Sequence, residues 1–216
     1  MKFRRKSADS EAAAEPGLTA EDAAAEDAAA ASGPLDIDDI PDHDHLQRVD
    51  LGSMLIAPVD GLELRLQVDE DEEEVQAVVL AGPEGALELR AFAAPRGGDL
   101  WGEIRPRLAA DYAQRGGTAT EREGRFGTEL VCQLTVRTQD GRTGNQPSRV
   151  IGVNGSRWML RATLLGKPAV DVDASGPWED AIAKVVIRRG AQAMPVGAAL
   201  PLTMPPREQL VERSDA

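Results

Sequence analysis

Alternation of apolar and polar residues is the clearest pattern along this chain. In LELRLQV (62–68) the leucines and the valine fall on one side, and Glu63, Arg65 and Gln67 fall on the other. This period of two is typical of a half-buried β-strand. The segments predicted as strands in the first half of the chain are SMLIAPV (53–59), LELRLQV (62–68), VQAVVLA (75–81) and ALELRAFA (86–93). The DG and GPEG turns between them predict two hairpins, joined by the acidic run DEDEEE (69–74) as a loop.

Two segments have helical spacing instead. Apolar residues recur at a period near 3.6 between Trp101 and Tyr112, after Asp99 as a candidate N-cap and before the Gly116-Gly117 stop. The proline at position 106 lacks the N–H of a regular turn and predicts a kink or a restart. A second amphipathic pattern begins near Pro177. We therefore expect helices near 99–115 and 177–187, the second running into the β-branched stretch VVIRRG.

The second half of the chain predicts two more hairpins. TATERE (118–123) and TELVCQLTVR (128–137) flank a GRFG turn, and a polar loop is expected over 138–147. In SRVIGVNGSRWMLRATLLG (148–166), Asn154-Gly155 fits a two-residue type I′ turn. That register sets Ile151 opposite Trp158 and places Trp158 inward.

This order predicts one α+β domain, in which a mostly antiparallel sheet of about eight strands, arranged in hairpins, is covered by two helices. The low-complexity, Ala- and acid-rich residues 1–34 lack large apolar side chains and predict a disordered arm. An acidic lead-in (35–50) connects the arm to the domain, expected over 51–205 and ending in a Pro-rich strap. Residues 206–216 are polar and predict a frayed tail.

Charge is concentrated at one end of the chain. The formal net charge is −13, and residues 1–50 hold 13 acidic and 5 basic residues. An acidic chain is repelled by nucleic-acid phosphates and by anionic membranes, so we expect no nucleic-acid binding. An acidic arm favours a basic protein partner instead.

The cellular setting follows from what the sequence lacks. Cys132 is the only cysteine, which excludes an internal disulfide and fits a reducing compartment. No apolar run approaches the roughly 20 residues of a membrane span. The basic start MKFRRK is followed by SADSEAAAEPG rather than by a hydrophobic region, so no secretory signal is expected. These features predict a cytoplasmic protein.

The richest cluster of candidate metal ligands is DHDH in the lead-in. Asp42, His43, Asp44 and His45 offer carboxylate oxygens and imidazole nitrogens. Adjacent residues rarely converge on one ion, however, so a solvated linker is the favoured interpretation. DEDEEE lacks the glycine and the oxygen spacing of an EF-hand loop. No metal and no cofactor is therefore expected.

No catalytic constellation stands out. The strand pattern turns Cys132 inward, and both histidines lie in the lead-in, so a cysteine nucleophile is disfavoured. Carboxylates are the remaining candidates for acid–base work, and nothing in the sequence pairs them: Glu103, Asp111, Glu129 and Asp180. A pocket between sheet and helices is the alternative, with an aromatic lining of Trp101, Tyr112, Trp158 and Trp178.

One candidate interaction surface is basic. With Trp158 inward, the strand alternation sends Arg157 and Arg161 outward together, where a pair of guanidinium groups would suit a carboxylate or a phosphate.

Four separate motifs, in this order, resemble an uncharacterised family of actinobacterial proteins, a domain of unknown function: RVDLGSMLIAP (48–58), FAAPRGGDLW (92–101), GVNGSRWMLRATLLG (152–166) and VVIRRG (185–190). The resemblance covers about 48–205. Asn154 and Ser156 depart from the family's Gly-Val-Asp-Gly-Pro-Arg-Trp pattern in ways compatible with the same turn. The resemblance implies no activity. The order of strands and helices is also similar, at the level of the fold, to Mog1/PsbP-like proteins.

The sequence therefore leaves the activity unknown. It favours a non-enzymatic protein-binding or accessory module with an acidic disordered arm, and no catalytic residues are assigned. The alternative is a small-molecule binder or an enzyme with a pocket between sheet and helices.

Overall fold

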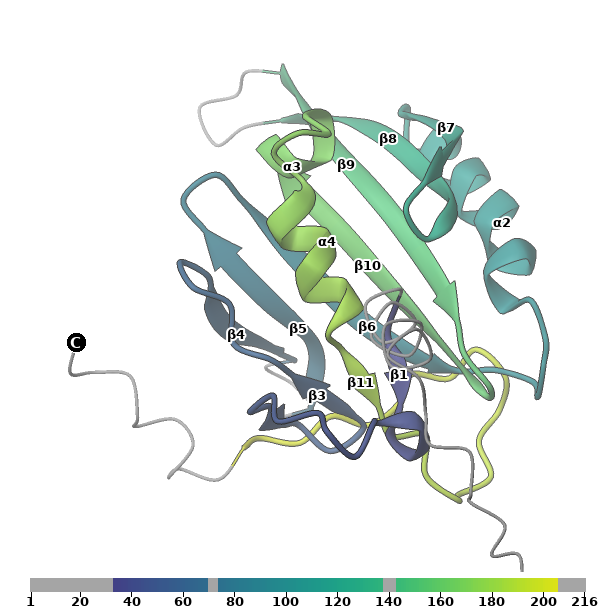
Figure 1. Ribbon diagram of the computed structural model, residues 1–216. Helices are drawn as coiled ribbons and strands as arrows, with labels where there is room; N and C mark the ends of the chain where they lie inside the picture. The colour runs from purple at the N-terminus through teal and green to yellow at the C-terminus, as the bar shows by residue number, and fades with distance from the viewer. Residues whose placement is uncertain (1–32, 70–73, 138–142, 206–216) are drawn as a thin grey trace, which may run out of the picture.

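A computed structural model describes residues 33–69, 74–137 and 143–205. The predicted disordered arm, apart from its last two residues, and the predicted frayed tail lie outside these ranges. The largest element is a seven-stranded antiparallel sheet in the order β4-β5-β6-β10-β9-β8-β7 (Figure 1). Its strands are β4 (Glu63–Val68), β5 (Val75–Gly82), β6 (Gly85–Ala93), β7 (Thr118–Gly124), β8 (Gly127–Arg137), β9 (Thr143–Asn154) and β10 (Trp158–Gly166).

A smaller sheet brings together segments that are far apart in sequence. Its order is β1-β11-β3-β2, formed by β1 (Leu35–Asp36), β2 (Val49–Asp50), β3 (Met54–Ile56) and β11 (Val186–Ile187). β1 pairs in parallel with β11, and a 3₁₀ turn, η1 (Ile37–Asp39), follows it. Part of the acidic lead-in is thus built into the sheet.

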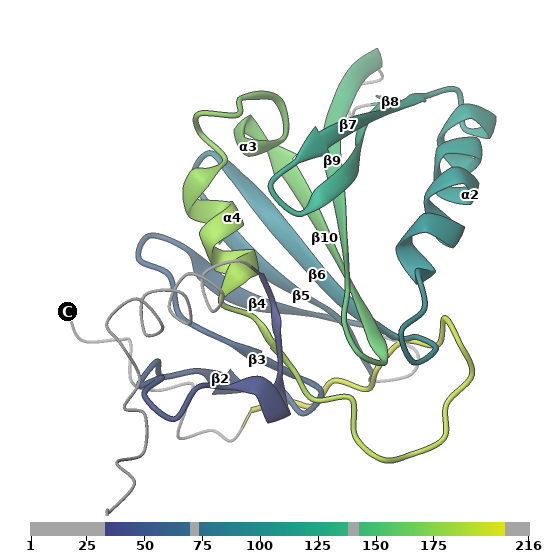
Figure 2. The same ribbon diagram turned by 45° about the vertical axis from the view of Figure 1, so that its right-hand side comes forward.

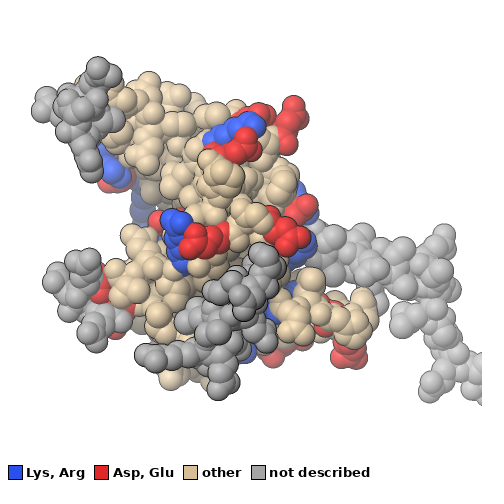
Figure 3. Space-filling view, turned by 90° about the vertical axis from the view of Figure 1, so that its left-hand side faces the viewer, with Lys and Arg blue, Asp and Glu red and all other residues tan. Residues whose placement is uncertain are grey.

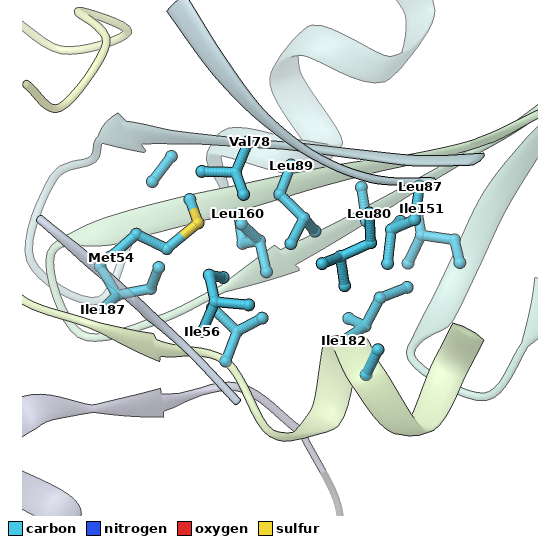
Figure 4. Packing of buried hydrophobic residues seen from close by; sticks show 14 of the residues in the cluster. Met54, Ile56, Val78, Leu80, Leu87, Leu89, Ile151, Leu160, Ile182 and Ile187 are labelled. Carbon is cyan, nitrogen blue, oxygen red and sulfur yellow. The ribbon is translucent and has the colours of Figure 1, made fainter. Parts of the chain in front are cut away.

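Helices cover both faces of the large sheet. α2 (Leu100–Gln114) lies on one face, and α3 (Lys167–Val170) and α4 (Gly176–Ala183) lie on the side of the small sheet (Figure 2). The large sheet has a hydrophobic core on each face, and successive side chains of β10 point to opposite cores. Leu160 belongs to the main core under α4, and Met159 belongs to the smaller core under α2. The main core packs Met54, Ile56 and Ile187 of the small sheet against Leu80, Leu89 and Leu160 of the large one (Figure 4). The fold is α+β, as the sequence predicts.

The start of α2 is fixed by its cap. The Asp99 side chain accepts a hydrogen bond from the Gly102 N–H at 2.8 Å and a second from the Asn154 side chain at 2.7 Å. This confirms the predicted N-cap and links the helix to the β9–β10 hairpin. The helix continues through Pro106 without a break, and Gly116 follows it with a φ of 77°. No helix within the described ranges is long and apolar enough to cross a membrane.

Two strand predictions are wrong. Residues 54–56 do not pair with β4, because β3 joins the small sheet between β2 and β11. The Asp-Gly turn at 60–61 therefore carries the chain from one sheet to the other. Residues 143–147 form the first part of β9 rather than a loop. Although this stretch is polar, its backbone pairs with that of β8. The second helix also ends four residues earlier than the predicted 187, because α4 stops at Ala183 and β11 follows.

The β9–β10 hairpin has the predicted faces but a different register. Met159 pairs with Asn154 and Ala162 pairs with Ile151, so the connecting loop is longer than a two-residue turn. The Gly155 N–H bonds the Trp158 carbonyl at 2.8 Å, while the Asn154 side chain is committed to the start of α2. Trp158 is buried on the main-core face with Ile151, as expected.

Candidate functional site

Two hollows and one buried ion network are the features that stand out. The larger hollow, called here the β4 groove, has a volume of about 1030 Å³. It is lined by residues 47–49 at the start of β2, by 58–59 and 61–65 leading into β4, and by 80–83 at the end of β5. Within the described ranges β2 and β4 are the outer strands of their sheets on this side. The groove therefore lies between two strand edges.

The main core is open along this groove. Four apolar side chains that line the groove and pack on the core are only partly buried: Val49, Val59, Leu62 and Leu64. On the side of the molecule that carries β4, acidic and basic side chains form small mixed clusters separated by uncharged surface (Figure 3). In β4, the exposed side chains of Arg65 and Glu63 form an ion pair, with Arg65 Nη2 2.6 Å from Glu63 Oε2. The groove thus combines outer strand edges of the two described sheets with an apolar floor and a charge-balanced rim.

The second hollow, called here the α2 pocket, has a volume of about 410 Å³ and lies between the C-terminal half of α2 and the large sheet. Its lining is Glu88 of β6; Leu108, Asp111, Tyr112 and Arg115 around α2; Leu134 of β8; Gln146, Ser148 and Val150 of β9; and Arg161, Thr163 and Leu165 of β10. It shares no lining residue with the β4 groove.

Hydroxyl groups meet where α2 packs on β9. The Tyr112 hydroxyl lies 3.1 Å from Ser148 Oγ and also interacts with the thiol of Cys132, which is fully buried. Burial raises the pKa of Tyr112, and the hydrogen bond with Ser148 only partly offsets this. The phenol therefore stays protonated at neutral pH and can donate a hydrogen bond.

Cys132 is expected to resist alkylation. Burial raises the pKa of its thiol to about 11, outweighing a hydrogen bond with Tyr112 that lowers it. Because the thiolate is the nucleophile, iodoacetamide at pH 8 should modify the native protein far more slowly than the urea-unfolded protein, as followed by intact-mass spectrometry. The native rate should rise only as the pH approaches 11. Equal rates in the two states would contradict the burial of this thiol.

Two arginines line the α2 pocket, and Arg115 pairs with Asp111 at 3.5 Å. Arg161 is the other. Its side chain is 23% exposed, and its Nη2 lies 3.8 Å from Glu88. It also stacks over the Phe92 ring, 5.3 Å from the ring centroid. Burial lowers the pKa of this guanidinium, and the neighbouring Arg90 adds to the effect, while Glu88 opposes it. Within the described part of the chain the guanidinium has no hydrogen bond, so its donors are available at the pocket.

A buried ion network connects α4 to the sheet. Arg149 of β9 is 2% exposed and pairs with Glu179 of α4, and its Nε lies 3.2 Å from the Glu129 carboxylate of β8. Arg122 Nη2 holds the other oxygen of Glu129 at 2.5 Å, and Ser175 Oγ donates to Glu179 at 2.9 Å. Neither hollow reaches this network. The charges balance in pairs, and the arrangement fixes the position of α4.

Arg149 was missing from the candidate residues of the sequence. It shares the parity of Ile151 and Val153, which point into the main core, so the alternation places it inward. A charged side chain is tolerated at this buried position because Glu129 of β8 and Glu179 of α4 pair with it. Of the four candidate carboxylates, Glu129 is buried in the network, and Asp180 pairs with Arg125 at 2.5 Å on the surface. Asp111 lines the α2 pocket, while Glu103 is exposed in the first turn of α2.

The DHDH cluster lies in the described loop before β2. Asp44 is engaged by Arg48 at 2.8 Å and by the Leu46 N–H at 2.8 Å. Burial raises the pKa of Asp44, but these hydrogen bonds outweigh it, so the net shift is downward. Asp42, His43 and His45 are exposed. Over the described ranges, no three His, Cys, Asp or Glu side chains gather in a way that could hold a metal ion.

The structure places the two candidate arginines in different surroundings. Arg161 faces the α2 pocket, whereas Arg157 lies in the hairpin loop, with its Nη2 3.4 Å from the Gly190 carbonyl of the strap. Of the four aromatic residues considered as a lining, Tyr112 lines a hollow. The three tryptophans are at most 5% exposed and belong to the cores.

The comparisons with known proteins give a family but no activity. No match was found among curated proteins. Among solved structures, a crystal structure from Bacteroides thetaiotaomicron matches with a TM-score of 0.32 and 15% identity over 67% of this chain. The chain spans about half of that protein, 52% of its length. A family model described as "Protein of unknown function (DUF3710)" matches residues 33–210. This match begins at the lead-in that carries β1 and spans both sheets, and the chain therefore belongs to the DUF3710 family.

Proposed function

We propose that this protein is a non-enzymatic accessory module that binds an extended segment of a partner protein in the β4 groove. The observation that carries the proposal is the open side of the main core between two strand edges. A strand edge presents unpaired N–H and C=O groups, which an extended peptide can complete by adding a strand. The apolar floor, with Leu62 and Leu64, would receive alternate side chains of that segment.

The partly buried leucines favour a ligand with apolar residues at every second position. Exposed apolar surface that continues from a core commonly marks a binding site. On the rim, Arg65 pairs with Glu63 and Arg48 pairs with Asp44, so positive and negative charges are balanced there. Main-chain pairing and apolar contact, rather than charge, should therefore dominate affinity in the groove.

The acidic N-terminal arm supplies the second part of the proposal. The arm (1–34) carries seven acidic and four basic residues, and the lead-in (35–50) adds six acidic residues and one basic residue. This acidic excess suits a partner with a basic region near the bound segment. A cytoplasmic location fits the single cysteine and the acidic balance. An actinobacterial origin and a Mog1/PsbP-like fold also remain proposals, supported by the motif order and by the arrangement of strands and helices.

Photocrosslinking in cells tests the groove. A benzophenone amino acid replaces Gln47 or Arg65 on the rim, and Val196, which is 57% exposed on the strap, serves as the control position. We expect the two rim positions to capture the same partner peptide, and mass spectrometry should map the adduct to an extended, alternating segment. Identical adducts from the rim and from Val196 would reject the groove.

Substitution separates the groove from the arm. Leu64→Asp should abolish the rim crosslink, whereas Val196→Asp should leave it intact, because only the first places a charge on the apolar floor. Removing residues 1–32 should lower the crosslink yield and reduce its dependence on salt, because long-range charge attraction is screened. A crosslink that survives Leu64→Asp in a folded protein would show that the groove is not the binding site.

A further inference from the structure

The α2 pocket contains an arginine whose donors are unused. Over the described residues Arg161 makes one long ion pair, 3.8 Å to Glu88, and no hydrogen bond, although its side chain is only 23% exposed. Guanidinium groups that are largely removed from water normally have hydrogen-bond partners, since each carries five donors. The Phe92 ring supports the flat face of the guanidinium, which leaves its edge for a ligand.

A second observation points to an anion. Arg161 lies directly opposite Arg90 in the pairing of β10 with β6, on the same face of the sheet. Like charges in directly opposite positions are destabilising. Arg90 is hydrogen bonded to the backbone and side chain of Gln76, so it is held in place beside Arg161. An anion bound at Arg161 would relieve this repulsion.

The rest of the lining restricts the ligand. Tyr112, Ser148 and Thr163, which carry hydroxyl groups, line the same hollow. Its apolar lining residues include Leu108, Leu134 and Leu165. A planar carboxylate matches the guanidinium fork in two parallel hydrogen bonds, and an apolar body would contact the leucines. The volume of about 410 Å³ lies within the range of small-molecule sites.

We propose that the α2 pocket binds a small carboxylic acid with an apolar body, whose carboxylate pairs with Arg161. The site is independent of the β4 groove. Two carboxylates line the pocket, and Asp111 pairs with Arg115. Glu88 is the one that competes for Arg161, because it lies beside the guanidinium and opposes a bound carboxylate. Binding therefore exchanges a long internal ion pair for a hydrogen-bonded external one.

Three substitutions test the proposal because their expected effects have different signs. Arg161→Gln should weaken carboxylate binding by at least about tenfold, the effect of losing hydrogen bonds to a charged group. Glu88→Gln should tighten binding several-fold, because it removes the competing charge. Arg157→Gln, in the same hairpin but held against the strap, should leave binding unchanged. A purely structural role for Arg161 would not produce tighter binding in the Glu88 variant.

The measurement uses the full chain and defined probes. Hexanoate, benzoate and glutarate are titrated by NMR, with the Arg161 Nε–H signal as the local reporter and calorimetry for affinity. Hexanamide tests whether binding requires the negative charge of the carboxylate, and hexylphosphonate tests whether the pocket prefers a different class of anion. We expect a carboxylate to shift the Arg161 signal and to bind at least about tenfold more tightly than the amide.

Three results would overturn the proposal. One is the absence of Arg161-dependent binding for all three carboxylates, and another is equal binding of hexanoate and hexanamide. The third is a preference for the phosphonate, which would assign the pocket to another class of anion. If Arg161→Gln fails to fold, Arg161→Lys keeps the charge without the fork and should still weaken binding. Circular dichroism and thermal unfolding establish that each variant is folded.

Discussion

Replacing Arg149 with methionine should lower the free energy of unfolding by about 3–5 kcal/mol, because it leaves buried carboxylates without their partner. Glu129 is 1% exposed, and the side chain of Glu179 is 13% exposed, so water cannot replace the guanidinium fully. Domains of this kind are stable by only about 5–15 kcal/mol, so the variant should be close to unfolding. Urea denaturation followed by circular dichroism measures the change.

Two matched variants show whether the cost is electrostatic. Neutralising both carboxylates, as Glu129→Gln with Glu179→Gln, should recover most of the stability lost in Arg149→Met, because no unpaired buried charge remains. Arg65→Met breaks an ion pair whose side chains are 62% and 66% exposed, and it should leave the unfolding midpoint unchanged. If Arg149→Met were as mild as Arg65→Met, the buried network would contribute nothing to stability.

Replacing Trp158 with alanine is expected to cost about 3–5 kcal/mol of unfolding free energy, the usual range for emptying a core site of this size. Trp158 is 2% exposed in the main core, and its indole N–H donates to the Asp36 carboxylate at 3.0 Å. Asp36 belongs to β1, so the indole also fastens the lead-in to the hairpin. Thermal or urea unfolding followed by circular dichroism provides the measurement.

A phenylalanine at position 158 distinguishes the packing of the aromatic ring in the core from the hydrogen bond that holds β1. Trp158→Phe keeps an aromatic ring but removes the donor to Asp36, so it should cost about 1–3 kcal/mol. Hydrogen exchange of the Leu35 amide, which bonds the Val185 carbonyl at 3.0 Å, should accelerate more than exchange in β9. Ser156→Ala removes the other hydrogen bond to Asp36, 2.6 Å long, at an exposed site and serves as the milder comparison. Unchanged exchange at Leu35 in Trp158→Phe would show that β1 is held by other contacts.

Local pattern was enough for most strands of the large sheet and for their faces, but it missed β1, β2 and the first part of β9, and it did not identify the strand partners. Alternation correctly assigned Trp158 and Ile151 to one core, and the capping pattern correctly began α2 after Asp99. The pairing of β3 with β11 joins residues from opposite ends of the chain, and no local signal encodes it. The hairpin register differed because the Asn154 side chain bonds the start of α2, a tertiary contact that overrides the turn preference of Asn-Gly.

The candidate sites show the same division. Arg161 was expected as an outward cation, and the structure gives it Glu88, Phe92 and the α2 pocket, all contributed by other segments. The alternation within β9 predicts that Arg149 points inward, but its carboxylate partners belong to β8 and α4 and cannot be found from β9 alone. Hollows and buried ion networks depend on which strands become neighbours, and in this fold that is decided by long-range pairing.

The small sheet also has a consequence for the order of folding. β1, β2 and β3 emerge early during synthesis, but β11, which lies between β1 and β3, follows only at residues 186–187. Contacts that close such long loops form late, because the entropy of loop closure must be overcome before they form. The strands of the large sheet from β4 to β10 can pair while the ribosome is still translating. β2 and β3 can pair with each other early, but β1 and this pair are joined into one sheet only after β11 has been made, so the β4 groove takes its final shape late in folding.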